Sequence, residues 1–264
     1  MIKEATINVQ NIPRSQKDVK RAFTPKLDAF LFFDYKAIEV RLLAYYLARG
    51  INDNSLRDEI ISGMDPHRVT AQGLYNKQDI TDEERQVGKT LNFSIIYGGG
   101  TPTIMRQLGV SYQEAKRLLD AYHDTRPGIS LLRKSIDNTL AIRGYIINSH
   151  GRNLHVTESH KALNALIQGS AADVMREAVV TTHKYLNTHL KYSHIVNIIH
   201  DEIMLDVDLD EVEDLVDNVP ICMTPMSINE VMPIEVDAEI AYKTWADKEE
   251  YERSGKQPVA LHAG

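Results

Sequence analysis

Residues 29–41 read AFLFFDYKAIEVR, and this stretch decides the fold. Its first six residues form a short apolar run with three phenylalanines, which favours a buried strand. Residues 37–49 then carry apolar side chains at helical spacing. A strand therefore delivers Asp34 to its carboxyl end, where a helix begins.

A second informative stretch, residues 195–207, reads IVNIIHDEIMLDV. Two β-rich runs, at residues 195–199 and 203–207, flank the tripeptide His200-Asp201-Glu202. This pattern predicts a tight hairpin that presents polar side chains at its tip. A carboxylate at a hairpin tip is available for chemistry.

The remaining pattern is mostly helical. Thr81 and Ser111 each precede a glutamate by three residues, which predicts a capping box at each helix start, and Asp65-Pro66 predicts another helix start. Expected helices cover residues 53–63, 66–75, 82–97, 112–123, 127–142, 158–190 and 210–218, with a hairpin at 144–156 and a final strand at 234–240. The fold class expected is α+β, with a sheet built from both ends of the chain and the helices between forming an inserted lobe.

The composition is that of a globular protein. With 264 residues and 43% hydrophobic content, the chain can bury a sizeable core in one or two domains. It contains no run of about 18 apolar residues, its first residues lack a signal-peptide pattern, and Cys222 is its only cysteine. We therefore expect a protein of the reducing cytoplasm, without a disulfide or a thiolate metal cluster.

The net charge of −7 is unevenly distributed. Residues 1–200 carry 26 basic and 20 acidic side chains, a balance of +6, whereas residues 201–264 carry 4 and 17, a balance of −13. The positive remainder permits a phosphate-binding surface. The acidic run is interpreted as a solvated helix face; it comprises Asp206, Asp208, Asp210, Glu211, Glu213, Asp214 and Asp217.

The helix predicted at residues 82–97 carries Arg85, Lys89, Phe93 and Tyr97 at four-residue steps. At about 100° per residue these side chains form one slowly drifting stripe of two cations followed by two aromatics. A nucleoside triphosphate has charge at one end and a π-face at the other, so this stripe matches both.

In this order, the three segments resemble the polymerase module of the family A DNA polymerases, the bacterial polymerase I and phage T7 type. The resemblance runs from about Thr6 to Trp245. It implies a palm with a small antiparallel sheet, an inserted helical fingers lobe and no thumb. The implied ranges are residues 1–50 for the first part of the palm, 51–157 for the fingers and 158–264 for the second part of the palm.

The resemblance implies template-directed addition of deoxynucleotides to a primer 3′ end by a two-metal mechanism. Asp34 and Asp201 match the two metal-binding aspartates, and the Tyr35 carbonyl is implied as a further ligand. Carboxylate oxygens suit Mg²⁺, so two Mg²⁺ ions are expected, with Mn²⁺ as a substitute. Glu202 is implied to be an accessory carboxylate near the primer end.

The resemblance also assigns contacts to the incoming dNTP. Lys89 is expected to contact the α-phosphate and to protonate the leaving pyrophosphate, while Arg85 holds the outer phosphates. The resemblance further implies that Tyr97 contacts the templating base, Phe93 the sugar and His67 the triphosphate. Glu39 is implied to be a steric gate that excludes ribose. The three glycines at 98–100 would let this helix swing closed. Gln86 and Ser94 depart from the family pattern, where arginine and glycine are common.

Duplex contacts are implied for several further residues. Asn164 and Gln168, four apart on the long helix, would meet minor-groove acceptors together with His200. His160 stands where the family has an arginine. Arg152 matches an arginine that contacts the template.

Family members carry a thumb before this region. The segment around Val9-Gln10-Asn11-Ile12-Pro13 is preceded in them by an arginine that contacts primer and substrate, and here Met1 falls at about that place. A truncated chain and a split polymerase are the competing explanations. We favour the split, in which a second polypeptide supplies the thumb and a 3′–5′ exonuclease, in a bacterium or a phage-infected cell.

Two alternative functions stay open. A ribonucleotide-using single-subunit polymerase is opposed by Glu39 and Phe93. A non-catalytic DNA-binding or assembly subunit that retains the fold is opposed by the presence of Asp34, Asp201 and Lys89.

Overall fold

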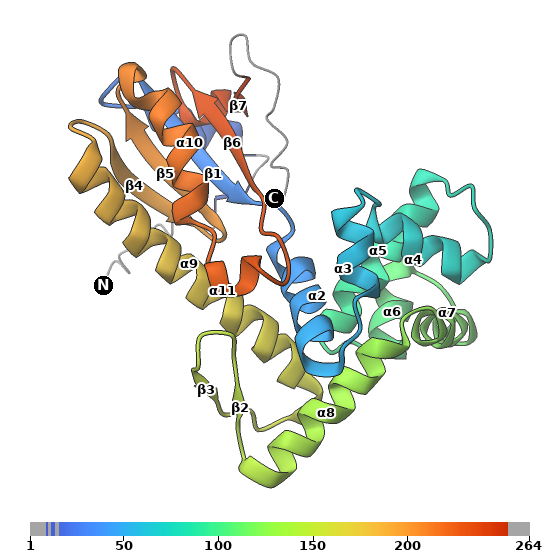
Figure 1. Cartoon of the computed structure of the whole chain (residues 1–264). Coiled ribbons are helices and arrows are strands. Elements are labelled where there is room, and N and C mark those ends of the chain that lie inside the picture. The colour runs from blue at the N-terminus through green and yellow to red at the C-terminus, as the bar shows by residue number, and fades with distance from the viewer. Residues whose placement is uncertain (1–8, 10–11, 14–15, 253–264) are drawn as a thin grey trace, which may run out of the picture. The chain divides into compact units, whose positions relative to one another are not determined.

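The computed structural model describes residues 9, 12–13 and 16–252. Met1, Thr6, Gln10 and Asn11, which carry part of the predicted resemblance, lie outside these residues. The chain forms two compact units (Figure 1). The sheet unit comprises the described residues up to Lys36, Ala178–Met223 and the described residues from Glu235 onward, and the helical unit comprises Ala37–Glu177 and Thr224–Ile234. The palm and fingers ranges expected from the sequence are a functional division and stay a prediction.

The sheet unit is built on an antiparallel sheet with the strand order β4-β5-β1-β6-β7 (Figure 1). The strands are β1 (Ala29–Tyr35), β4 (His194–Ile199), β5 (Glu202–Val207), β6 (Val236–Ala241) and β7 (Glu249–Glu250). Its helical segments are α1 (Lys17–Lys20), η3 (Leu209–Glu211), α10 (Val212–Cys222), η4 (Trp245–Asp247) and part of α9 (Ala162–His189). The expectation of an α+β fold with a sheet from both ends of the chain is confirmed.

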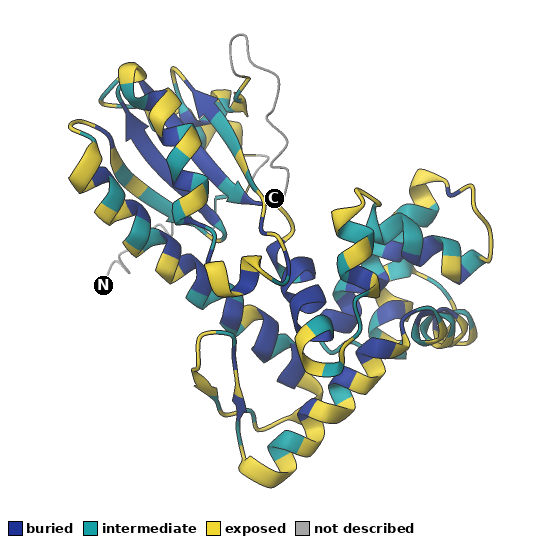
Figure 2. Cartoon of the chain, viewed as in Figure 1, coloured by how far each residue is buried: buried dark blue, intermediate teal, exposed yellow. Residues whose placement is uncertain are grey.

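The central strand β1 explains why residues 29–35 are so apolar. It pairs with β5 on one side and with β6 on the other, and only Asp34 of its seven residues is not buried (Figure 2). Side chains alternate between the two faces of a strand, so Phe30, Phe32 and Asp34 share one face. Full burial of a phenylalanine contributes about 1.5–3 kcal/mol, so this strand anchors the sheet.

The register gives this face an acidic end and an apolar end. Directly opposed residues in antiparallel strands share a face, and Asp34 is opposite Glu202 on β5 and Asp237 on β6. At the other end Phe30 and Phe32 cluster with Met204, Ala241 and Trp245. The pairing of β1 with β5 and β6 therefore brings carboxylates together beside a hydrophobic cluster.

The helical unit contains the rest of the chain. Its helices are α2 (Ile38–Ile51), α3 (Ser55–Ile61), α4 (Pro66–Tyr75), α5 (Asp82–Ile96), α6 (Thr101–Leu108), α7 (Tyr112–Thr125), α8 (Pro127–Arg143), η2 (Ser159–Lys161), the first part of α9 and α11 (Met226–Asn229), with a hairpin of β2 (Ile146–Ile147) and β3 (Asn153–Leu154). The predicted helices of residues 53–142, the hairpin and the long helix are present within a few residues of their expected bounds.

The helix starts follow the predicted capping chemistry, with one correction. The Asp65 carboxylate accepts from the backbone N–H groups of His67 and Arg68, and Thr81 with Glu84 forms a complete capping box. Ser111 accepts from the backbone N–H of Glu114, but the capping box predicted there is incomplete. The Glu114 carboxylate binds Arg117 instead, because this guanidinium one turn later offers it two charge-assisted hydrogen bonds.

Helix α6 was not expected, because the three glycines at 98–100 indicate the end of a helix. They do end α5, but Gly100 is also the N-cap residue of α6, and Pro102 lies in its first turn. Proline is favoured there since its missing N–H has no helical partner to lose. The glycines therefore connect two successive helices.

The interpretation of the acidic run as a solvated helix face is wrong for several of its members. Asp206 is 3% exposed, and its carboxylate accepts the backbone N–H groups of Lys26 and Leu27. Glu211 accepts three backbone N–H groups, from residues 191–193. The Asp206 and Glu211 carboxylates are buried or engaged because nearby backbone donors need acceptors. Asp214 is exposed on α10, as interpreted from the sequence, and accepts the Tyr185 hydroxyl.

Among the helices within the described part of the chain, none combines the length and the apolar composition that crossing a bilayer requires.

Candidate active site

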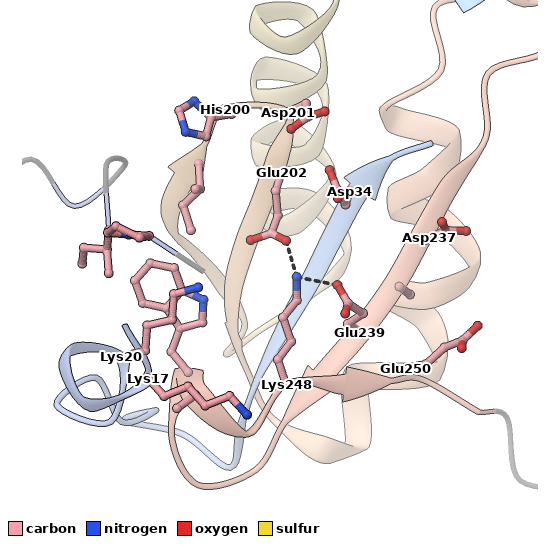
Figure 3. A pocket seen from close by; sticks show the side chains of 16 residues that line it. Lys17, Lys20, Asp34, His200, Asp201, Glu202, Asp237, Glu239, Lys248 and Glu250 are labelled. Atoms are coloured by element: carbon pink, nitrogen blue, oxygen red, sulfur yellow. Dashed lines mark hydrogen bonds and ion pairs between the residues drawn. The ribbon is translucent and has the colours of Figure 1, made fainter. Parts of the chain in front are cut away.

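A cavity of about 800 Å³ lies at the acidic end of the sheet face (Figure 3). Six carboxylates and three lysines line it: Asp34, Asp201, Glu202, Asp237, Glu239, Glu250, Lys17, Lys20 and Lys248. Such an excess of negative charge in a concave site favours the binding of cations. Hard carboxylate oxygens are the ligands that Mg²⁺ prefers.

Asp34 and Asp201 reach this cavity from neighbouring strands. Asp34 lies near the end of β1, and the backbone N–H of Tyr35 donates to the Asp201 carbonyl at 3.3 Å. His200 and Asp201 form the predicted tip between β4 and β5, and His200 adopts the left-handed conformation with φ of 57°. The structure therefore brings together the two aspartates that are 167 positions apart in sequence (201 − 34).

Tyr35 points away from this chemistry. Its ring is buried, and its hydroxyl donates to the Met223 carbonyl. Only its backbone carbonyl is therefore suited to the metal-ligand role predicted from the sequence.

Glu202 lies directly opposite Asp34 and is 8% exposed. Its carboxylate forms an ion pair with Lys248, which also pairs with Glu239. Burial alone would lower the pKa of Lys248, but the two carboxylates outweigh this effect and raise it. Sequence reasoning missed Lys248, Glu239 and Asp237. The only signal available for the two carboxylates was the alternation of acidic residues along the last predicted strand, and Lys248 lies beyond that strand.

A metal ion in this cavity would have few ligands from the protein. Among the described residues, no three histidine, cysteine, aspartate or glutamate side chains are grouped so that they could hold a metal ion. Two aspartates and a backbone carbonyl still fit Mg²⁺, since this ion is commonly held by one or two carboxylates together with substrate phosphates and water.

The helical unit carries the cationic stripe on α5. Lys89 and Phe93 line a second cavity, of about 320 Å³, together with Gln86, Thr90 and Gln107. The Phe93 ring stacks on Tyr97 with ring centres 6.4 Å apart, and the centre of the His67 ring lies 5.7 Å from that of Phe93. Phe93 is therefore the residue of the predicted stripe that shares a cavity with Lys89 and contacts two further rings.

Arg85 departs from the simple expectation for a phosphate ligand. Its guanidinium is ion-paired with Asp65, the residue that caps α4. Burial would raise the pKa of Asp65, but the hydrogen bonds from Arg85 and the His67 backbone lower it. A phosphate that binds Arg85 would have to share the guanidinium with this carboxylate.

His67 is embedded in a polar network. Its Nδ1 lies 3.0 Å from the Asn92 amide nitrogen, and Asn92 also contacts Thr70 and Tyr122. Burial lowers the pKa of His67 to about 4, although Asp65 opposes the shift. The imidazole is therefore neutral at pH 7, and a phosphate contact from it would be a neutral hydrogen bond.

The remaining predicted dNTP residues also lie in the helical unit. Tyr97, at the C-cap of α5, donates to the Glu39 carboxylate on α2. Ser94, where the family commonly has glycine, is buried and donates to Gln107 on α6. Gly98 has φ of +76°, and a Cβ there would lie 2.4 Å from the His160 carbonyl oxygen.

Apart from His200 at the tip between β4 and β5, the predicted DNA contacts lie along α9 and in the segment before it. Asn164 is half-buried and Gln168 is exposed, one turn apart on α9. Arg152 is ion-paired with Asp173 at 2.7 Å and donates to the Gly169 carbonyl at 3.0 Å. His160 is exposed in η2, 3.5 Å from Glu158.

Comparison with known proteins agrees with this arrangement. A sequence model described as DNA polymerase family A matches residues 2–247. The chain belongs to this family. Family A membership and the α+β fold expected from the sequence are thereby confirmed.

Among its family A relatives, the chain is 32% identical to DNA polymerase I of Lactococcus lactis subsp. cremoris over 257 residues, which cover 90% of this chain and 29% of that protein. It is 34% identical to the DNA polymerase of Mycobacterium phage L5 over 211 residues, which cover 78% of this chain and 33% of that protein. The chain thus spans about a third or less of these relatives.

A solved structure is also similar. It is the POL domain of Pol1 from M. smegmatis in complex with DNA primer-template and dNTP, with a TM-score of 0.80 and 25% sequence identity. The match covers 91% of this chain and 45% of that one.

Proposed function

We propose that this chain is a template-directed DNA polymerase module that adds deoxynucleotides to the 3′ end of a primer. The observation that carries the proposal is the convergence of Asp34 and Asp201 on one cavity, in a chain that belongs to DNA polymerase family A. The Pol1 domain with a similar fold was solved with primer-template and dNTP, which supports the same substrates here.

Asp34, Asp201 and the Tyr35 carbonyl would hold two Mg²⁺ ions, which Mn²⁺ could replace. When bound, the two ions lower the pKa of the primer 3′-hydroxyl and stabilise the leaving pyrophosphate. Glu202 would act near the primer end, as a carboxylate that is not a metal ligand.

The helical unit would bind the incoming dNTP. Lys89 would contact the α-phosphate and give a proton to the departing pyrophosphate. Arg85 would hold the outer phosphates, and His67 would contact the triphosphate. Phe93 would contact the sugar and Tyr97 the templating base, with Glu39 excluding a ribose hydroxyl. Asn164, Gln168, His200 and Arg152 would contact the duplex.

Primer extension by an Asp201→Ala variant tests the proposal. Loss of this carboxylate should lower extension by at least about 10³-fold, because metal ions contribute several kcal/mol of transition-state stabilisation. Binding of primer-template DNA should change little. Asp210→Ala, which removes an exposed aspartate outside the cavity, is the matched control.

Normal extension by Asp201→Ala would rule out the proposed catalytic role. The same assay addresses the non-catalytic alternative, since a DNA-binding subunit would show no extension in either form. The expectation of a second polypeptide that supplies a thumb stays a prediction. It requires that co-purifying proteins stimulate extension by the wild-type chain and not by Asp201→Ala.

A further inference from the structure

Lys248 occupies the acidic cavity as the partner of two carboxylates. Its Nζ forms ion pairs with Glu202 and Glu239 (Figure 3). The same Nζ lies 4.7 Å from the centre of the Phe32 ring. Only 22% of its side chain is exposed, so these interactions are weakly screened. The resemblance and the comparisons assign no role to this lysine.

The backbone on both sides of Lys248 is fixed. It follows the short helix η4, whose residue Trp245 donates its backbone N–H to the Phe23 carbonyl at 3.0 Å. It precedes β7, which pairs with β6 so that Glu250 is opposite Glu239. The ordered segments before and after Lys248 therefore hold its side chain in the cavity.

Of the two carboxylates that pair with Lys248, Glu202 is the one for which the position of this lysine matters most. It is next to Asp201 in sequence and directly opposite Asp34 in the sheet. A nearly buried carboxylate needs a counter-charge, and Lys248 supplies it. Removal of that lysine would take away this counter-charge, beside the site where the two aspartates would bind a divalent cation.

We propose that Lys248 is a positioning residue that keeps the Glu202 carboxylate out of the divalent-cation site of Asp34 and Asp201. The inference rests on the proposed function, which places the cation there. A third carboxylate would tighten cation binding but would occupy a coordination position that a substrate phosphate needs. Among the described residues, no three carboxylates are arranged so that they could hold a metal ion, which agrees with this assignment.

Mn²⁺ binding to the whole chain, followed by electron paramagnetic resonance without DNA or nucleotide, tests the inference. Lys248→Met should bind Mn²⁺ on the order of tenfold more tightly, because it removes a nearby positive charge and releases Glu202. Lys248→Arg should stay close to the wild type. Lys77→Met is the matched control, since Lys77 pairs with Glu84 at 2.7 Å in the helical unit.

A second pair of variants identifies Glu202 as the released ligand. Glu202→Gln alone should change Mn²⁺ affinity by less than about twofold, because Glu202 is not a ligand while Lys248 holds it. The double variant Glu202→Gln/Lys248→Met should lose most of the tenfold gain. Unchanged affinity in Lys248→Met, or a gain that persists in the double variant, would overturn the inference.

Glu202→Gln also decides the matter if Lys248→Met does not fold. A loss of Mn²⁺ affinity of about tenfold or more would show that Glu202 is already a ligand and would refute the inference. Asp201→Asn separates this failure from failure of the proposed function. Undiminished Mn²⁺ binding by Asp201→Asn would refute the metal site itself, whereas weakened binding together with an inert Lys248→Met would refute only the role of Lys248.

Discussion

The phenolic hydroxyl of Tyr97 donates to both carboxylate oxygens of Glu39, at 3.0 Å to Oε1 and 2.8 Å to Oε2. The two residues are 58 positions apart and come from the C-terminal end of α5 and the first turn of α2. A hydroxyl that donates to a carboxylate forms a charge-assisted hydrogen bond, so each side chain fixes the other. The predicted sugar gate and the predicted base-stacking ring are thus one unit.

Shortening Glu39 should therefore relax sugar selection. In Glu39→Ala, the preference for dNTP over rNTP, measured as a ratio of kcat/KM values in primer extension, should fall roughly 10²-fold. Glu39→Gln preserves the shape and should retain most of the preference. Tyr97→Phe removes only the hydrogen bond and should have an intermediate effect. A preference that is unchanged in Glu39→Ala would contradict the steric gate.

The lowered pKa of His67 predicts a pH dependence of stability. Its pKa is about 4 in the folded chain and 6.5 as the ordinary value, so between these pH values the unfolded state binds more protons. The free energy of unfolding should accordingly rise with pH from 4 to 6.5, with a slope of up to about 1.4 kcal/mol per pH unit from this group.

His67→Gln should reduce that slope by as much as one proton. Urea unfolding at several pH values between 4 and 7.5 measures it. His183→Gln, which replaces an exposed histidine on α9, is the control and should leave the slope nearly unchanged. Equal slopes in the wild type and His67→Gln would show that the burial of His67 does not shift its protonation.

Gly98 and Gly109 form a matched pair for the connection around α6. Both have positive φ, of +76° and +66°, but a Cβ at Gly98 would lie 2.4 Å from the His160 carbonyl oxygen, whereas nothing lies within 4 Å at Gly109. Gly109→Ala should cost about 1–2 kcal/mol of unfolding free energy from the backbone alone. Gly98→Ala should cost about 1–3 kcal/mol more, because of the clash. Equal losses would mean that the backbone near His160 can move away freely.

Asp206 should matter for stability although it lies in a run of acidic residues. Asp206→Asn should lower the free energy of unfolding by about 1–3 kcal/mol, since its amide N–H₂ would replace the oxygen that accepts one of the two backbone N–H groups of Lys26 and Leu27. Asp210→Asn, at an exposed position, should change it by less than about 0.5 kcal/mol. Denaturant unfolding compares the two. A harmless Asp206→Asn would show that these hydrogen bonds add little.

Sequence reasoning succeeded where the signal is local. The strand that carries Asp34 and the hairpin that carries Asp201 are short apolar runs next to turn residues, so their type and ends follow from neighbouring positions. The cap at Asp65 and the capping box at Thr81 are likewise set within four residues. The register of the strand that carries Asp34 against the hairpin that carries Asp201 is fixed only in the folded sheet.

The missed features depend on contacts between distant segments. Lys248 looks like an ordinary charged residue near the end of the sequence, and only the pairing of β7 with β6 places it beside Glu202. Asp206 looks like one of seven solvated acids, but the backbone N–H groups of residues 26 and 27 surround it. No local pattern reports partners that are 46 or 180 positions away.

The strand order β4-β5-β1-β6-β7 has a consequence for biosynthesis. The middle strand β1 is synthesised before both of its neighbours, which are encoded after residue 200, so its hydrogen-bonding edges stay unpaired while the residues between are translated. Helices α2 to α8 rely on contacts between nearby residues and can form in the meantime. The nascent polypeptide therefore carries an exposed, phenylalanine-rich segment for a long time, and this segment is where we expect a chaperone to bind during synthesis.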